Sequence, residues 1–200
     1  MSDGTGTPEE YFDYARHVSR LDAASLTDHD AYGFDLLDEH NEIWKSIQKT
    51  AHRMNAPGSF VTLPGYEWTS WTYGHKHVLF LSEPAPLYSS RDPRYETPEK
   101  LWKALAQSRA ITISHHVGGG PIPADWDYYS HDLEPVVEIC SIHGNSEYYG
   151  CPMCIYRPRR GCFVQDALER GYHLGLIGGG DTQNSHPGHG DPISPIGSIN

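Results

Sequence analysis

The sequence contains no long hydrophobic run, and this absence excludes a helix that spans a membrane. Its start, MSDGTGTPEE, is polar and acidic and lacks the apolar segment of a signal peptide. We therefore expect a cytoplasmic protein with no membrane partner. Positive charge is also scarce, because 15 Lys and Arg residues stand against 26 Asp and Glu residues, for a net charge of −11 at pH 7. So acidic a chain repels a phosphate backbone, which argues against nucleic acid as a partner.

The sequence features of several common enzyme sites are missing as well. No G-x-S-x-G motif is present, and the glycine runs at 118–120 and 178–180 lack the Lys and Ser or Thr of a phosphate-binding loop. The chain has only four cysteines, three of them close together at Cys151, Cys154 and Cys162. A C-x₂-C pair is an element of zinc sites, but the second pair that a structural zinc needs is missing. Reduced thiols are therefore favoured over a zinc knuckle.

Periodicity and capping residues predict helices in 7–21, 34–54, 97–109 and 162–172. Thr7 and Thr97 are each followed by Pro, the pair typical of an N-cap and the first helical position. Short apolar runs predict strands in 22–26, 59–68, 77–81, 110–114, 135–142 and 173–179. These runs are mostly continuous, as in strands that are covered on both faces. We therefore expect one α/β domain over residues 1–200, with a parallel sheet or barrel of about six strands.

The chain has thirteen histidines, far more than its core could bury without partners. Four of them lie in polar segments and are expected on the surface: His17, His40, His52 and His131. Potential metal ligands follow the apolar runs instead, at 27–30, Glu67, 114–116, 138–147 and Asp181. Because sites assemble at the carboxyl ends of parallel strands, these side chains predict one site. Imidazole and carboxylate ligands suit Zn²⁺, Mn²⁺ or Fe²⁺, and a carboxylate such as Glu67 can bridge two ions.

Four segments in order, at 2–30, 64–69, 111–116 and 178–182, resemble the polymerase and histidinol phosphatase (PHP) family. Members of that family fold as a distorted seven-stranded β/α barrel around two or three metal ions. The resemblance implies the same barrel here, in an incomplete form. The first strand with its His-x-His pair and the closing element at the other end are expected to be missing. Because a lost strand leaves unpaired edges, we also expect self-association into a homo-oligomer.

The metal ligands that the resemblance implies are His29, Glu67, His75 or His77, His115 or His116, Asp181 and, from the loop beyond it, His186. Catalysis would rest on Glu67 as the bridging carboxylate, on His29 and on Asp181. Spacing does not choose within either histidine pair, and Asp181 has an alternative role as a helix N-cap after a glycine turn. Arg157, Arg159 and Arg160, together with His143, would bind an anionic substrate, although the arginines fit a solvated turn equally well.

These residues predict a metal-dependent hydrolase of phosphate esters, acting on a small phosphomonoester or phosphodiester through a metal-activated hydroxide. Its cofactors would be two or three divalent ions. Two alternatives stay open. One is a degenerate or partner-dependent metal-binding fragment without turnover, and the other is an exonuclease of the PHP type, which the acidic charge disfavours.

Overall fold

The computed structural model describes residues 4–188. The helices are α1 (Pro8–Asp13), which continues as a π-helical segment (Tyr14–Val18), α2 (Asn41–Met54), α3 (Pro98–Leu105) and α4 (Val164–Glu169). The strands are β1 (Ala23–Ala24), β2 (Val61–Thr62), β3 (Gly65–Ser70), β4 (Gly74–Phe80), β5 (Ala110–Ser114), β6 (Val136–Ser141), β7 (Gly144–Asn145) and β8 (Gly175–Gly178). No helix in this part of the chain is both long and apolar enough to cross a membrane.

The capping residues of two helices are confirmed. The Thr7 hydroxyl accepts a hydrogen bond from the Glu10 amide at 3.2 Å, and the Glu10 carboxylate accepts one from the Thr7 amide at 2.8 Å. This reciprocal pair is a capping box, which satisfies amides that have no partner inside the helix. Thr97 caps α3 in the same way, through the amide of Lys100. The helix expected over 34–54 begins only at Asn41, because the residues before it form turns.

The main sheet is open and mixed, so the expected parallel sheet and the distorted barrel are both wrong. Strand β3 pairs antiparallel with β4, and β4 pairs antiparallel with β5. Strand β6 then joins β5 in parallel, and it also pairs with β8 in parallel and with β7 antiparallel. Strands β1 and β2 form a separate small parallel sheet. Within residues 4–188 these strands make no closed barrel.

The first strands of the sheet, β3 and β4, are antiparallel because the connection between them is short. Only residues 71–73 lie between β3 and β4, whereas a parallel pair needs a crossover of roughly a dozen residues or more. A turn this short can join only antiparallel neighbours. The two strands are therefore one hairpin, and Glu67 lies directly opposite His77 in its register.

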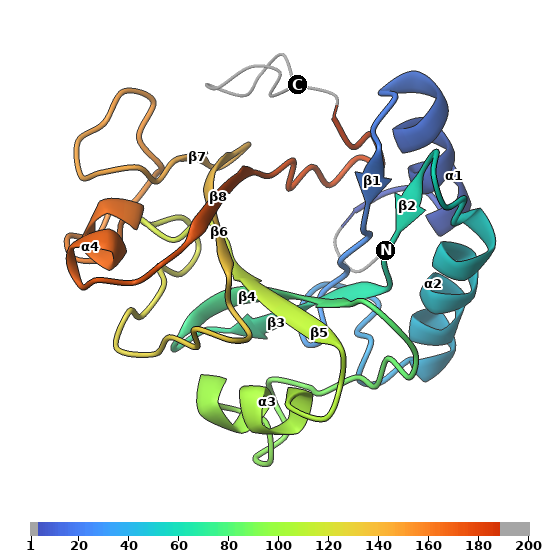
Figure 1. Ribbon diagram of the computed structural model, residues 1–200, viewed down its shortest axis with the longest axis horizontal. Coiled ribbons are helices and arrows are strands. Elements are labelled where there is room, and N and C mark those ends of the chain that lie inside the picture. Colours follow the sequence, from blue (N-terminus) through green and yellow to red (C-terminus); the bar gives the residue numbers. More distant parts are fainter. Residues whose placement is uncertain (1–3, 189–200) are drawn as a thin grey trace.

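The two faces of this hairpin have different surroundings. Tyr66, Trp68, Val78 and Phe80 point to one face, where they join the main hydrophobic core with side chains of α1, α2 and α3. Figure 1 shows α1 and α2 beside β1 and β2, α3 near β3 to β5, and α4 beside β8. The alternate positions of the hairpin, Glu67 among them, point to the other face. That second face carries the polar residues described next.

Candidate metal centre

Glu67 lies in the middle of β3, and the segment that contains His29 runs alongside it. The Glu67 amide donates to the Asp28 carbonyl at 2.8 Å, and the Asp30 amide donates to the Glu67 carbonyl at 2.9 Å. These two hydrogen bonds hold 28–30 parallel to β3, as an additional bridge outside the regular strands. The side chain of His29 is thereby brought to the same side of the sheet as Glu67.

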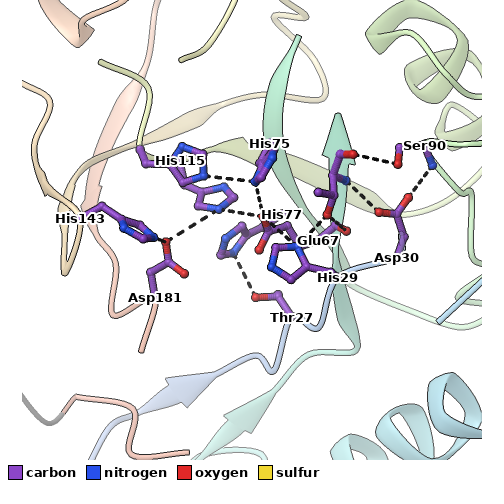
Figure 2. Close-up of polar contacts among 12 residues, drawn as sticks. Thr27, His29, Asp30, Glu67, His75, His77, Ser90, His115, His143 and Asp181 are labelled. Carbon is purple, nitrogen blue, oxygen red and sulfur yellow. Dashed lines mark hydrogen bonds and ion pairs between the residues drawn. The ribbon is translucent and has the colours of Figure 1, made fainter. Parts of the chain in front are cut away.

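One carboxylate oxygen of Glu67 is surrounded by histidines (Figure 2). Its Oε1 atom lies 2.7 Å from His75 Nδ1, 3.3 Å from His29 Nδ1 and 3.3 Å from His115 Nε2. Glu67, His75, His115 and His116 each offer a ligand atom within 4.8 Å of the others, and all four side chains are buried. The described residues contain no second group of this kind with three or more members. The arrangement could hold a metal ion.

Several ring nitrogens in this cluster have no hydrogen-bond partner among the described residues. They are His75 Nε2, His77 Nε2, His115 Nδ1 and His116 Nδ1. Burying a polar group without a partner costs free energy of the order of 1–3 kcal/mol, and native proteins contain few such groups. Four of them on one face of a sheet indicate that the cluster is built around something else, and a metal ion satisfies lone pairs of this kind.

Asp181 and His143 extend the cluster beyond β5. The Asp181 carboxylate lies 2.9 Å from His143 Nε2 and 4.0 Å from His115 Nε2. Asp181 follows β8, and His143 lies between β6 and β7, so this contact joins two neighbouring loops. His115 is therefore shared between Glu67 on one side and Asp181 on the other (Figure 2).

Glu138 belongs to the same buried group; it lies in the predicted ligand segment 138–147 but is not among the individually expected ligands. Its carboxylate accepts a hydrogen bond from the His116 amide at 3.1 Å. Its other oxygen lies against the backbone of Gly179, where a Cβ atom would come within 1.8 Å of it. Only glycine leaves the Glu138 carboxylate in this position. The signal that could have identified Glu138 is a lone acidic residue inside an apolar run.

The charges of Glu67 and His115 stabilise one another. Burial by itself would raise the pKa of Glu67, but the positive charges of His115 and His29 and the hydrogen bonds from His115 and His75 hold it well below its usual range. Burial would likewise lower the pKa of His115, yet the Glu67 carboxylate outweighs it and raises the value to about 9. In the absence of metal the pair is thus an ionised carboxylate beside an imidazolium at neutral pH.

The other groups of the cluster divide into neutral histidines and acidic groups. Burial, helped by the charge of His115, lowers the pKa of His77 to about 3, and burial also lowers the pKa of His75 and of His116. Burial raises the pKa of Glu138 to about 7, and the charge of Asp181 adds to this. His75, His77 and His116 are therefore already in the neutral form that binds metal.

The position of His29 is fixed from behind by hydrogen bonds. Thr69 Oγ1 lies 2.7 Å from His29 Nδ1, and the Thr69 amide donates to Asp30 Oδ1 at 2.8 Å. The second oxygen of Asp30 accepts from the Ser90 amide. Burial raises the pKa of Asp30 to about 6, although the hydrogen bonds from Ser90 and Thr69 oppose that rise. This supporting set contacts the cluster through His29 and orients its ring.

A cavity of about 540 Å³ adjoins the cluster. At one end it is lined by Glu67, His77, His115, Glu138 and Asp181. Its remaining wall comes largely from β1, β8 and the segments beside them, where small and apolar residues such as Ala23 and Ile177 predominate. The potential ligands therefore lie at the polar end of a cavity that a small molecule could enter.

The chain matches the family described as "Protein of unknown function (DUF3604)" over residues 10–152. It belongs to the DUF3604 family. An uncharacterized protein of Chlamydia pneumoniae is 26% identical over 108 residues, which are 53% of this chain and 17% of that protein. The crystal structure of PsfC from Pseudomonas syringae PB-5123 superimposes with a TM-score of 0.49 and 14% identity, over 88% of this chain and 68% of that one.

Membership of DUF3604 corrects the resemblance to the PHP family, which is wrong as an assignment. The segments that carried it are short and rich in His, Asp and Glu. Such residues are common wherever a divalent ion is bound. They therefore indicate the chemistry of a site and do not identify a protein family. The open sheet of this DUF3604 chain also lacks the barrel that the resemblance implied.

The structure brings most of the expected site residues together. The group comprises His29, Glu67, His75, His77, His115, His116, His143 and Asp181. Both members of each histidine pair face it. No helix begins after Asp181 in the described segment 182–188, so its alternative role as an N-cap does not apply.

Other expected site residues lie elsewhere in the DUF3604 chain. His186 is exposed, and its ring lies 4.4 Å from that of Tyr14. Arg157, Arg159 and Arg160 are exposed on the loop before α4. The Arg160 guanidinium stacks 3.9 Å from the Tyr149 ring, whereas Arg157 directly follows a tyrosine near the cluster. All four cysteines are free.

Proposed function

We propose that this DUF3604 chain is a metal-dependent hydrolase of phosphate esters that acts on small phosphomonoesters or phosphodiesters. One observation carries the proposal: Glu67, His75, His115 and His116 place buried ligand atoms within 4.8 Å of one another. In a tetrahedral site with metal–nitrogen bonds of 2.0–2.1 Å, the ligand atoms are about 3.3 Å apart. The contacts of 2.7 and 3.3 Å around Glu67 are close to that spacing.

The donor set suits a borderline metal rather than calcium or magnesium. Neutral imidazole favours Zn²⁺, Mn²⁺ or Fe²⁺, whereas Mg²⁺ and Ca²⁺ prefer oxygen ligands alone. His75 and His116 have lowered pKa values, caused first by burial, and are therefore ready to bind without losing a proton. Against the effect of burial, the charges of His115 and His29 hold the pKa of Glu67 well below its usual range, so its carboxylate is ionised and can bind a cation.

We propose that a second ion binds next to the first, near Asp181 and Glu138, although within the described part of the chain these residues do not form a second ligand group of three or more members. Asp181, His143 and Glu138 lie beyond His115, so the acidic groups form two sets on either side of one histidine. When bound, a pair of divalent ions polarises a phosphoryl oxygen and lowers the pKa of a water molecule. This two-ion arrangement supports ester hydrolysis without a serine or cysteine nucleophile.

His143 is the residue placed to protonate a leaving group. Two cluster histidines lie near Asp181. The side chain of His143 is 20% exposed, whereas that of His115 is 1% exposed. Burial would lower the pKa of His143, but its hydrogen bond to Asp181 and the charge of that carboxylate raise it. An imidazolium held at the edge of the centre can donate its proton to a departing alkoxide. Asp181 orients the ring for that transfer.

A metal-binding chain without turnover is the second function to consider. The burial of the ligands favours it, because Glu67, His75 and His115 are each less than 5% exposed. A centre so enclosed could serve structure alone. The chain also spans only 17% of its chlamydial relative, so the activity of any longer protein is a separate question.

The decisive experiment measures metal content and hydrolysis together. Protein purified without added metal should contain one or two transition-metal ions per chain by elemental analysis, and it should hydrolyse p-nitrophenyl phosphate. Dialysis against a chelator should abolish the activity, and Mn²⁺ or Zn²⁺ should restore it. Glu67→Gln should lower metal affinity by at least about 100-fold, whereas His52→Ala, on the exposed side of α2, should match the parent.

The outcomes separate the two functions. Bound metal with no hydrolysis of mono- or diesters would favour the metal-binding chain without turnover. Absence of bound metal, together with no binding of added Zn²⁺ or Mn²⁺, would overturn both. Full activity in Glu67→Gln would exclude Glu67 as a ligand.

A further inference from the structure

Three exposed aromatic side chains surround the metal centre. Tyr32 is 44% exposed, Trp71 is 51% exposed and Tyr156 is 45% exposed. Exposed aromatic residues that gather around a polar site are typical of ligand binding, because their faces gain contacts only when something covers them. Of the five tryptophans in the chain, Trp71 is the one that is not buried.

Two of these residues form one wall, which rests on the histidines of the cluster. The Tyr32 ring lies 5.0 Å from the His29 ring, and the Trp71 ring lies 5.5 Å from the His75 ring. Tyr32 and Trp71 are 5.4 Å apart. All three pairs meet edge to face, which is a favoured geometry for aromatic rings. Trp71 is further held by its place in the tight turn between β3 and β4.

Tyr156 provides a second wall. Its ring lies 5.8 Å from that of His143, the residue placed to protonate a leaving group. Its carbonyl accepts a hydrogen bond from the Gly120 amide at 2.7 Å. Gly119 lies so close that a Cβ atom there would be 2.6 Å from the same carbonyl oxygen. The glycine run at 118–120, which fits no phosphate loop, thus fixes Tyr156 beside the centre.

The histidines of the centre connect the two walls: the His143 ring lies 5.5 Å from the His116 ring, and the His116 ring lies 4.9 Å from the His75 ring. Burial raises the pKa of Tyr156, the nearby Arg157 opposes the rise, and the charges of Asp181 and Tyr32 add to it. An aromatic group that contacts these walls would therefore lie next to the histidine cluster.

We propose an aromatic clamp made of Tyr32, Trp71 and Tyr156. The clamp selects phosphate or phosphonate esters that carry an aromatic ring, either on the leaving group or on the group that stays bound to phosphorus. The proposal rests on the proposed hydrolase function and names its substrate class. Stacking of a ring on an aromatic side chain changes affinity by about tenfold or more. A small aromatic ester is favoured over a nucleic acid, because the chain carries a net charge of −11.

The first test compares two esters that share a leaving group. Manganese-loaded protein is assayed with p-nitrophenyl phenylphosphonate and with p-nitrophenyl methylphosphonate. The phenyl ester should show kcat/KM about tenfold higher, through a lower KM. Trp71→Leu and Tyr156→Leu should each bring the ratio of the two esters close to one. Tyr148→Leu, at a tyrosine that is 40% exposed outside the clamp, should keep the parent ratio.

The second test needs no turnover. Trp71 is the tryptophan that acrylamide can quench, since Trp44, Trp68, Trp102 and Trp126 are buried. Phenylphosphonate should protect it from quenching, and methylphosphonate at equal concentration should not. Equal kcat/KM for both esters together with no protection would overturn the clamp and leave the hydrolase function standing. Absence of hydrolysis of both esters and of p-nitrophenyl phosphate would overturn the hydrolase function, while the protection experiment would still decide the clamp.

Discussion

The two faces of β4 present different solutions to burying charge. His75 and His77 point to the metal centre, and Lys76 between them points to the opposite face. There Lys76 Nζ donates to Glu134 Oε1 at 2.7 Å and to Ser114 Oγ at 2.6 Å. Both Lys76 and Glu134 are almost completely buried.

Burial alone does not distinguish a functional cluster from a structural one. On the Lys76 face a positive and a negative group are matched one to one, and of their charged atoms only Glu134 Oε2 has no hydrogen-bond partner among the described residues. On the histidine face at least four ring nitrogens have no such partner. Unsatisfied lone pairs that converge on one point mark a place for a ligand, whereas a matched ion pair does not.

The largest expected effect comes from breaking the ion pair. Lys76→Met leaves the Glu134 carboxylate buried without its partner, so the free energy of unfolding should fall by about 3–5 kcal/mol in urea denaturation. Lys76→Met combined with Glu134→Gln should recover much of that loss. The folded variants should bind as much metal as the parent. A variant that lost metal without losing stability would show that the two faces are not separate.

A smaller effect is expected at Gly179, on the histidine face. Gly179→Ala places a methyl group where the Glu138 carboxylate now lies, so that carboxylate must move. The affinity for a second ion should fall by about 10- to 100-fold, as a titration followed by elemental analysis would measure. Gly180→Ala is the matched control, because a Cβ atom there meets nothing closer than 3.9 Å. Equal losses in both variants would contradict a ligand role for Glu138.

Metal binding on the histidine face should depend on pH. His115 has a pKa of about 9, since the Glu67 carboxylate outweighs the effect of burial, so it carries a proton at pH 7. Metal must displace that proton, and affinity should therefore rise by about tenfold per pH unit from 7 towards 9 and fall as the pH drops. Calorimetry in two buffers of different ionisation enthalpy should detect one proton released. No release at pH 7 would contradict the protonated state of His115.

The smallest effect is expected at the edge of the sheet. Within the described residues β8 pairs only with β6, and Leu176 on it is 50% exposed. An unpaired edge can associate with a second copy of the chain. We therefore expect weak self-association through the β8 edge, the edge next to Asp181. Light scattering over a dilution series should detect it, and Leu176→Lys should reduce it. A monomer at all concentrations would contradict this prediction.

Local signals in the sequence predicted elements well but not their directions. The Thr7 and Thr97 caps are confirmed because capping depends on residues within one turn of each other. The direction of β4 depends on the connection 71–73, whose length excludes a parallel crossover. The hydrophobic pattern of an apolar run does not indicate the direction of its strand. The parallel sheet was wrong for that reason.

The histidines converge on one site as predicted, but not because they lie at the carboxyl ends of parallel strands. His75 and His77 share a face because side chains in a strand alternate. His115 and His116 both reach the cluster because β5 ends at Ser114 and His116 adopts a positive φ of 40°, which turns its ring back. Sequence spacing does not reveal that turn. Glu138 lies in the predicted ligand segment 138–147 but was not named as a ligand, because a single carboxylate within an apolar run resembles part of the strand.

The short hairpin of β3 and β4 also bears on when the metal centre forms during folding. Glu67, His75 and His77 lie within a dozen residues of one another, and hairpins of this size close in about 1–10 μs. Contacts close in sequence form before contacts between distant segments, so these three ligands can meet before Asp181 arrives. A divalent ion present at the start of refolding should then increase the folding rate. The same ion added after refolding should only slow unfolding, and stopped-flow measurements of the two orders of addition would distinguish them.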